Sequence, residues 1–267
     1  MRKIEELMSL AGKTAVVTGG AGHIGAAMAE ALAEVKATVV LVDRQADQLS
    51  QRAAEIRART NARVETFELE LADETAVRAL PERVADLCGG LDVLVNCAAF
   101  VGTSQLEGWA VPFEQQKTPA WRAAFEVNVT SVFELVQSAL PYLKSSGKGS
   151  VINVASLYGV VGPDWRLYEG TAMGNPAAYG ASKGALIQLT NWLATTLAPH
   201  VRINTISPGG VWRNQPDTFA TRYIERTPLQ RMAVEEDFKG AAVYLASDLS
   251  AYVTGQNLVV DGGWCAW

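Results

Sequence analysis

Residues 14–25 carry the sequence TAVVTGGAGHIG, and this stretch decides the fold. Its first five residues are apolar or β-branched, as in a buried strand, and apolar positions from Ile24 to Val35 recur at helical spacing. The glycines between them allow a tight turn and a close approach of the backbone to a phosphate, and the helix N-terminus supplies N–H groups and a positive dipole end. Glycines in a loop often mark only a turn, but the strand–turn–helix context here favours a dinucleotide-binding site.

The remaining sequence alternates between strand-like and helix-like segments. We expect strands at residues 14–18, 38–42, 63–69, 91–95, 150–154, 201–206 and 257–260, and helices at 24–35, 46–60, 74–87, 118–144, 179–198 and 235–246. Apolar strands that alternate with helices indicate a parallel sheet covered on both faces. The predicted fold class is therefore α/β, with residues 1–267 forming one doubly wound Rossmann-type domain of about seven strands and helices on both faces.

Composition and charge argue against several other classes of protein. The net charge of −5 is spread along the chain, so neither nucleic acid nor an anionic membrane is expected as a partner. Three scattered cysteines form no Cys-x-x-Cys motif and the chain has only two histidines, so we expect no disulfide framework and no metal site. The charged N-terminus does not resemble a signal peptide, and no apolar run reaches transmembrane length. A cytoplasmic location is expected.

Asp43 carries the prediction of cofactor type. It ends the second predicted strand, where a carboxylate can accept hydrogen bonds from the adenosine ribose and repel a 2′-phosphate. A capping or turn aspartate is the alternative interpretation. Arg44 follows and could favour the phosphorylated cofactor, but position 22 is a glycine and offers no second basic residue. The sequence therefore predicts NAD(H) in preference to NADP(H).

Tyr179 and Lys183 form the clearest candidate for catalytic chemistry. Residues four apart lie on the same face of a helix, and Tyr179 is the only one of seven tyrosines with a lysine at this spacing. An ammonium group favours the phenolate and so lowers a tyrosine pKa that is otherwise about 10. Such a tyrosine can act as a general acid or base near neutral pH. A solvated helix face is the alternative.

Seven motifs in this order resemble those of the short-chain dehydrogenase/reductase family. They are TGGAGHIG, NCAA at 96–99, VNVTSVF at 127–133, INVAS at 152–156, YGASK at 179–183, SPGG at 207–210 and VDGG at 260–263. The resemblance covers nearly the whole chain. Within the family, the stretches EGTAM, SPGGVWRNQ, YLASD and YVTGQNLVVDGGW look most like sugar-modifying members associated with bacterial surface and flagellar glycan synthesis.

The resemblance implies a catalytic group of four residues. Tyr179 would be the acid/base, and Lys183 would lower its pKa and hold the nicotinamide ribose. Ser156 would hydrogen-bond the substrate oxygen, and Asn128 would keep a kink in its helix and hold a water of the proton relay. Each has an alternative, because Ser156 could be a helix cap, Asn128 a satisfied core amide and Lys183 a solvated charge.

The resemblance also implies a set of cofactor-binding residues. It comprises Gly19, Gly22, His23, Ile24, Gly25, Asp43, Arg44, Glu70, Leu71, Asn96, Ala98, Val127, Tyr179, Lys183, Pro208, Gly209 and Val211. Four positions depart from the family pattern. His23 replaces a glycine and Glu70 replaces an aspartate beside the adenine. Ala99 replaces the usual glycine after Asn96, and Arg213 stands where a threonine commonly binds the carboxamide.

Three segments are expected around the substrate: 99–117, 157–178 and 210–226. The second is longer than is usual in the family, and long ordered loops are often functional. These segments mix aromatic rings with amides and charges, which suits a sugar, a sugar acid or a phosphorylated sugar, although loop polar residues usually face water and tryptophans usually pack. The candidate substrate residues are Trp109, Trp165, Glu169, Asn175, Trp212, Arg213 and Asn214.

The predicted function is NAD(H)-dependent interconversion of a secondary alcohol and a ketone on such a carbohydrate. The alternatives are a reductase of a ketoacyl or steroid-like carbonyl compound and a non-catalytic NAD-binding redox sensor. The resemblance implies a homotetramer. The apolar tail Trp264-Cys-Ala-Trp267 fits burial in a partner subunit, or it caps its own last strand.

Overall fold

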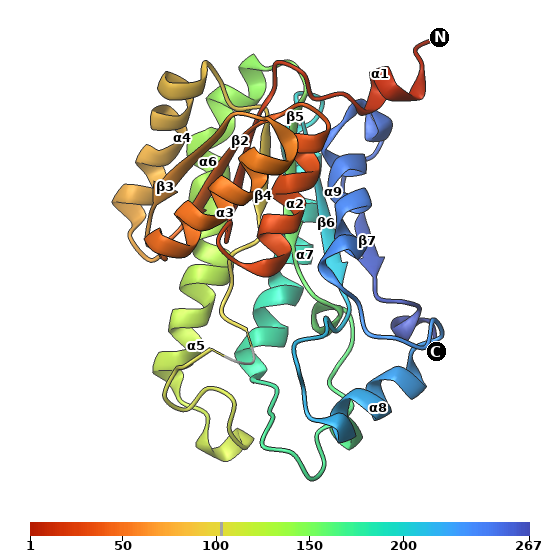
Figure 1. Ribbon diagram of the computed structural model, residues 1–267. Coiled ribbons are helices and arrows are strands. Elements are labelled where there is room, and N and C mark those ends of the chain that lie inside the picture. The colour runs from red at the N-terminus through yellow and green to blue at the C-terminus, as the bar shows by residue number, and fades with distance from the viewer. Residues whose placement is uncertain (102–103) are drawn as a thin grey trace.

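A parallel β-sheet forms the centre of the fold (Figure 1). The computed structural model describes residues 1–101 and 104–267. Within them, seven strands lie in the order β3-β2-β1-β4-β5-β6-β7. The strands are β1 (Thr14–Thr18), β2 (Thr38–Asp43), β3 (Val64–Glu68), β4 (Val93–Asn96), β5 (Gly149–Val154), β6 (Val201–Pro208) and β7 (Asn257–Val260). The predicted α/β class and parallel sheet are confirmed.

The strand order reverses beside β1, whose neighbours are β2 and β4. Thr18 pairs in register with Val42 on one side and with Asn96 on the other, and Asn96 pairs with Asn153 of β5. The carboxyl ends of these four strands therefore lie along one edge of the sheet. In open α/β sheets, ligands bind beyond this edge at the point of reversal.

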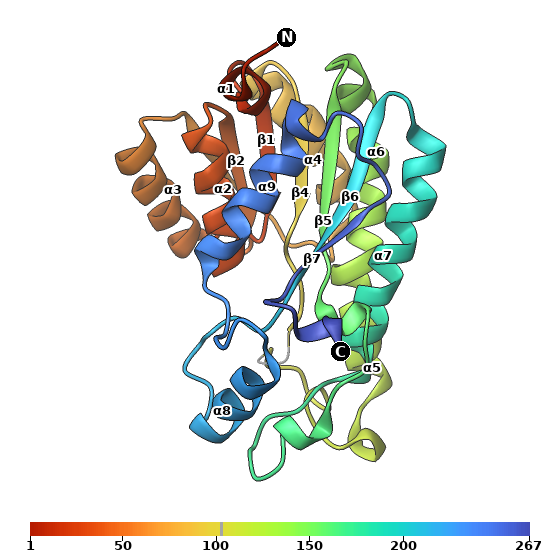
Figure 2. The same ribbon diagram turned by 90° about the vertical axis from the view of Figure 1, so that its right-hand side faces the viewer.

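Two layers of helices cover the sheet (Figure 2). One layer is α2 (His23–Glu34), α3 (Ala46–Thr60) and α9 (Lys239–Ala246), and the other is α4 (Glu74–Cys88), α6 (Ser131–Ser145) and α7 (Ala177–Leu197). Successive strand residues point to opposite faces, so Val17 packs with the first layer and Val16 with the second. Burial on both faces explains why the central strands are continuously apolar.

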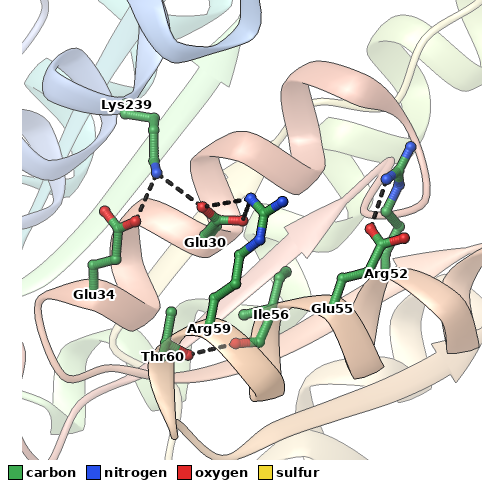
Figure 3. Close-up of polar contacts among 8 residues, drawn as sticks. All are labelled: Glu30, Glu34, Arg52, Glu55, Ile56, Arg59, Thr60 and Lys239. Carbon is green, nitrogen blue, oxygen red and sulfur yellow. Dashed lines mark hydrogen bonds and ion pairs between the residues drawn. The ribbon is translucent and has the colours of Figure 1, made fainter.

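Surface ion pairs connect the three helices of the first layer (Figure 3). Lys239 of α9 contacts Glu30 at 3.0 Å and Glu34 at 2.7 Å, both in α2. Arg59 of α3 contacts the same Glu30 at 3.2 Å. Glu30 thus joins helices that are distant in the sequence. Because Arg59 and Glu34 are solvated, these pairs are expected to add little to the stability of the fold.

The helix predicted at 118–144 is interrupted. The helix α5 (Thr118–Phe125) ends at a π-helical turn, Glu126–Thr130, and α6 follows. Asn128 lies buried in this turn, where its Nδ2 donates to Ser182 Oγ at 3.0 Å and its Oδ1 accepts from the Phe100 N–H at 2.8 Å. Such turns are frequent at functional sites because they redirect side chains.

Two helices were not predicted from the sequence, α1 (Ile4–Met8) and α8 (Asp217–Arg226). The segment 210–226 therefore contains a helix. The first residues of the helix predicted at 235–246 form a 3-10 turn, Glu235–Phe238. The expected substrate segment 99–117 includes residues 102–103, which lie outside the described residues. Among the helices of the described residues, none combines the length and apolarity needed to cross a bilayer.

Candidate active site

A cavity of about 930 Å³ lies beyond the carboxyl ends of the strands. One part, which we call the cofactor half, is lined by the turn 19–25 and by Asp43. The other part, the substrate half, is lined by side chains from the segment 157–178 and from α8, namely Tyr158, Tyr168, Asn175, Phe219 and Tyr223. Ser156, Tyr179 and Lys183 also line the cavity. The strand ends and the two irregular segments thus share one site.

Glycine is required at two positions of the turn 19–25. Gly19 has a φ of 70°, and a Cβ there would lie 2.8 Å from the Ala98 nitrogen. A Cβ on Gly25 would lie 2.2 Å from the Gly19 carbonyl oxygen. Without these side chains the N-terminus of α2 is open to the cavity, and the N–H groups of its first turn have no partners within the helix. This cradle fits the pyrophosphate of a dinucleotide.

Asp43 is held at the end of β2 by backbone N–H groups. Ala21 donates to its Oδ2 at 3.2 Å and Gln45 donates to its Oδ1 at 3.3 Å. The neighbouring Arg44 contacts Glu70 at 3.3 Å. The positive charge of Arg44 is therefore partly compensated by Glu70, while Asp43 presents a carboxylate to the cavity.

Lys183 is a buried cation, with only 2% of its surface exposed. Its Nζ donates to the Val154 carbonyl at 2.7 Å and lies 5.8 Å from the centre of the Tyr179 ring. Burial lowers the pKa of Lys183 to about 8. The interpretation of Lys183 as a solvated charge is therefore wrong.

Burial also changes the proton affinity of Tyr179. It raises the pKa of Tyr179, and hydrogen bonding to Ser156 opposes the rise. Desolvation is therefore the largest influence on this phenol in the chain by itself, and the lowering of its pKa by Lys183 stays a prediction.

Ser156 follows β5 and has two roles. Its Oγ accepts from the Tyr158 N–H at 3.2 Å and so caps the 3-10 turn Leu157–Gly159, as the alternative interpretation expected. The same side chain lines the cavity. Asn128 is not among the described lining residues, and its side chain forms a hydrogen bond to α7. It bonds Ser182, whose hydroxyl donates to the Tyr179 carbonyl at 2.8 Å.

The predicted cofactor residues line the cavity with one exception. Asn96 is buried beneath it, where its Nδ2 donates to Asn153 Oδ1 at 2.9 Å and its own Oδ1 is left without a hydrogen bond. The others lie on the wall: Gly19, Gly22, His23, Ile24, Gly25, Asp43, Arg44, Glu70, Leu71, Ala98, Val127, Tyr179, Lys183, Pro208, Gly209 and Val211.

The predicted substrate residues are mostly elsewhere. Asn175 and Arg213 line the cavity. The prediction that Trp109 contacts the substrate is wrong. Trp109 is 2% exposed in a separate apolar cluster, and its Nε1 donates to the Val101 carbonyl at 2.7 Å. Large rings in irregular segments gain most from packing, and burial removes this one from the cavity. Four further predicted residues are not among the described residues of the cavity wall: Trp165, Glu169, Trp212 and Asn214.

The substrate half contains residues that were not predicted from the sequence. They are Tyr158, Tyr168, Met173, Phe219, Tyr223 and Met232. Stacked or edge-on rings link Tyr168 to Phe219 at 5.3 Å, Phe219 to Tyr223 at 6.0 Å and Tyr223 to the tail residue Trp264 at 5.8 Å. The one signal in the sequence was the spacing of Phe219 and Tyr223, which is that of one helix face.

Comparisons with known proteins find relatives over nearly the whole chain. Residues 19–265 match a family model described as enoyl-(acyl carrier protein) reductase. Sorbose reductase of Schizosaccharomyces pombe is 32% identical over 273 residues, which cover 97% of this chain and 98% of the relative.

Two solved structures extend the comparison. A short-chain type dehydrogenase/reductase from Mycobacterium marinum has a TM-score of 0.87 at 29% identity and covers 100% of both chains. A gluconate 5-dehydrogenase from Burkholderia cenocepacia in complex with NADP and tartrate has a TM-score of 0.87 at 26% identity, covering 99% of this chain and 100% of that one.

Proposed function

The chain belongs to the short-chain dehydrogenase/reductase family, and from this premise we propose that it interconverts a secondary alcohol and a ketone with NAD(H). The proposed substrate is a sugar, a sugar acid or a phosphorylated sugar. The observation that carries the proposal is the presence of Ser156, Tyr179 and Lys183 on the wall of the same cavity as the glycine turn. This combination disfavours a redox sensor without turnover.

The side chains would divide the chemistry as follows. A bound nicotinamide cofactor would accept a hydride from the alcohol carbon or supply one to the ketone carbon. Tyr179 would move the proton of the substrate oxygen through its Oη, and Ser156 would hydrogen-bond that oxygen. Because burial raises the pKa of Tyr179, the phenol keeps its proton in the chain by itself, which suits proton donation to a ketone. Lys183 would hold a ribose hydroxyl with its ammonium group.

The preference for NAD(H) rests on Asp43. Its carboxylate faces the cavity and would repel a 2′-phosphate, while Arg44 is paired with Glu70 at 3.3 Å. The gluconate 5-dehydrogenase relative is complexed with NADP, so a direct test is needed. We expect a higher kcat/KM with NAD(H) than with NADP(H), and a lower ratio in the Asp43→Ala variant. A KM for NADP(H) equal to or below that for NAD(H) would refute the preference.

The carbohydrate assignment is supported by the wall of the substrate half. Aromatic rings alternate there with the amide of Asn175 and with tyrosine hydroxyls, which suits a ring that has both flat faces and hydroxyl groups. The similarity to a sorbose reductase agrees with this class. From the narrower resemblance in the sequence, we further propose that the reaction modifies sugars for bacterial surface or flagellar glycans in the cytoplasm.

A ketoacyl or steroid-like substrate is the second candidate. Met173, Phe219 and Met232 give the wall apolar surface, and a 3-oxoacyl-[acyl-carrier-protein] reductase is among the similar proteins at 33% identity. The two candidates predict opposite rankings of kcat/KM. We would follow nicotinamide absorbance with polyols, sugars, sugar acids and sugar phosphates beside a lipophilic ketone and an acyl substrate. Faster turnover of the lipophilic compounds than of every carbohydrate would replace the first candidate with the second.

We also propose a homotetramer. Trp264 is 1% exposed and packs on Tyr223 of its own chain, so the proposed contact with a neighbour rests on Trp267, which is 72% exposed. Size-exclusion chromatography with light scattering tests the assembly. A monomeric mass would contradict it.

A further inference from the structure

Three neutral polar side chains are joined by hydrogen bonds in the substrate half. The hydroxyl oxygens of Tyr158 and Tyr168 are 2.8 Å apart, and Asn175 Nδ2 donates to the Tyr168 hydroxyl at 3.2 Å. All three residues line the cavity, and all come from the segment 157–178. We call this group the Tyr–Tyr–Asn cluster.

The cluster has one hydroxyl proton to spare. Each tyrosine hydroxyl has one proton and two acceptor sites. The contact between the two tyrosines uses one proton, and the Asn175 contact uses an acceptor site of Tyr168. The second hydroxyl proton remains for another acceptor, whichever tyrosine donates to the other. Burial raises the pKa of both tyrosines, so both protons are retained across the physiological range.

The cluster lies next to the candidate catalytic group and is held in place. The Tyr158 N–H donates to Ser156 Oγ at 3.2 Å. Tyr158 is therefore bonded directly to the residue that is predicted to contact the reacting oxygen. The Tyr168 ring packs edge-on against Phe219 of α8 at 5.3 Å. Asn175 is buried. A polar group preorganised in this way can discriminate between ligands, because little ordering remains to be done on binding.

Charge in the cavity argues for an uncharged ligand group. Among the described lining residues, each arginine already has an acidic partner: Arg213 contacts Glu235 at 2.9 Å and Arg44 contacts Glu70 at 3.3 Å. A carboxylate or phosphate placed in the substrate half would have to compete for Arg213 with Glu235. A hydroxyl or carbonyl oxygen needs only the donor that the cluster offers.

We propose that Tyr158, Tyr168 and Asn175 bind a second, uncharged oxygen of the substrate, in addition to the oxygen that reacts. The enzyme would therefore select neutral polyhydroxylated ketones and polyols over the corresponding acids and phosphates. This inference rests on the proposed function and narrows its substrate class.

The test compares substrates that differ in one oxygen. We would measure kcat/KM for 2-hydroxycyclohexanone and cyclohexanone, and for a neutral ketose and its carboxylate counterpart. Wild-type enzyme should prefer the hydroxylated and the neutral member by roughly tenfold. In Tyr168→Phe the preference for the hydroxy ketone should fall to near one, whereas the exposed Tyr252→Phe, which removes a hydroxyl outside the cavity wall, should keep it. An unchanged preference in Tyr168→Phe, or faster turnover of the acid, would overturn the proposal.

A binding measurement separates this inference from the reaction itself. Calorimetry with the Tyr179→Phe enzyme saturated with NADH would give the affinities for 2-hydroxycyclohexanone and cyclohexanone without turnover. The two affinities should differ by roughly tenfold, and the difference should disappear when Tyr168→Phe or Tyr158→Phe is combined with Tyr179→Phe. This result would support the role of the cluster even if the wild-type enzyme turned over neither ketone. Equal or undetectable affinities count against the cluster, even where turnover of another alcohol upholds the proposed function. NADH affinity and thermal melting would show whether each variant is folded.

Discussion

The two halves of the cavity are built in different ways. The cofactor half consists mainly of residues at the carboxyl ends of the strands, such as the turn 19–25 after β1 and Asp43 at the end of β2, so the sheet itself positions their backbone. The substrate half consists of side chains from the segment 157–178 and from α8, which meet only in the folded chain. Recognition by backbone at strand ends is a local property, whereas recognition by side chains depends on long-range packing.

The substrate half also depends on residues that do not touch the cavity. Trp264 stacks on Tyr223 at 5.8 Å and lies under Arg226, whose guanidinium carbon is 4.2 Å from the ring centre. Arg226 in turn contacts Asp164 of the segment 157–178 at 2.8 Å. The C-terminal tail thereby braces α8 and this segment together. The cofactor half has no need of such a brace, because the strands hold it.

The largest effect is expected where both halves contribute to the reaction. Replacing Tyr179 with Phe removes the group proposed to move the proton and should lower kcat by about 10²- to 10⁴-fold. NADH affinity, measured by fluorescence titration, should stay close to that of the wild type. The exposed Tyr252→Phe should behave as wild type. Turnover that survives in Tyr179→Phe would show that another group donates the proton.

Removing the brace should damage the substrate half selectively. Trp264→Ala leaves a cavity beside Tyr223 and should lower the free energy of unfolding by about 3–5 kcal/mol. In folded enzyme, KM for the substrate should rise more than the Kd for NADH. Trp192→Ala in α7 is the matched control, since Trp192 is 57% exposed, and its effect on stability should be about 0.5 kcal/mol or less. Urea unfolding of both variants measures this, and equal losses would refute a bracing role for Trp264.

A change in the glycine turn should damage the cofactor half. The Cβ of Gly25→Ala would lie 2.2 Å from the Gly19 carbonyl oxygen, so the turn must shift. An overpacking cost of about 1–3 kcal/mol in the NADH complex would weaken NADH binding by about 5- to 150-fold. Gly240→Ala in α9 is the control, because a Cβ there meets nothing within 4 Å. An unchanged Kd for NADH in Gly25→Ala would remove the turn from the proposed site.

The smallest predicted effect concerns Lys183. Burial lowers its pKa to about 8 from 10.5, so between these values the unfolded chain binds more protons than the folded chain. Stability from this group therefore rises with pH, by about 1–2 kcal/mol between pH 7 and 9.5 in cofactor-free enzyme. Urea unfolding at both pH values should show this gain in wild type relative to Lys183→Met. A difference that does not change with pH would mean that the ammonium is not desolvated.

Much of the cofactor half could be predicted from sequence because its signals are local. The turn 19–25 follows a strand directly, and the end of β2 places Asp43 beside it. Asn96 is an exception, because its position along the chain does not predict where its side chain points. It follows the same pattern at the end of β4, yet its side chain points into the sheet toward Asn153 rather than into the cavity.

The substrate half could not be predicted in the same way. Trp109 and Tyr168 are both aromatic residues in irregular segments, and nothing local distinguishes the one that is buried from the one that lines the cavity. The distinction comes from what each ring packs against. Tyr168 meets Phe219 of α8, and Trp109 packs with Ala120 and Ala178.

The sequence by itself determined the alternation of strands and helices, the glycine turn, the carboxylate at the end of β2 and the pairing of Tyr179 with Lys183, since each depends on residues close along the chain. The tertiary structure alone decided which side chains face the substrate half. It also decided the proton affinities: burial, a property of the whole fold, raises the pKa of Tyr179 and lowers that of Lys183. Desolvation and packing depend on neighbours that are distant in sequence, and only the folded chain brings them together.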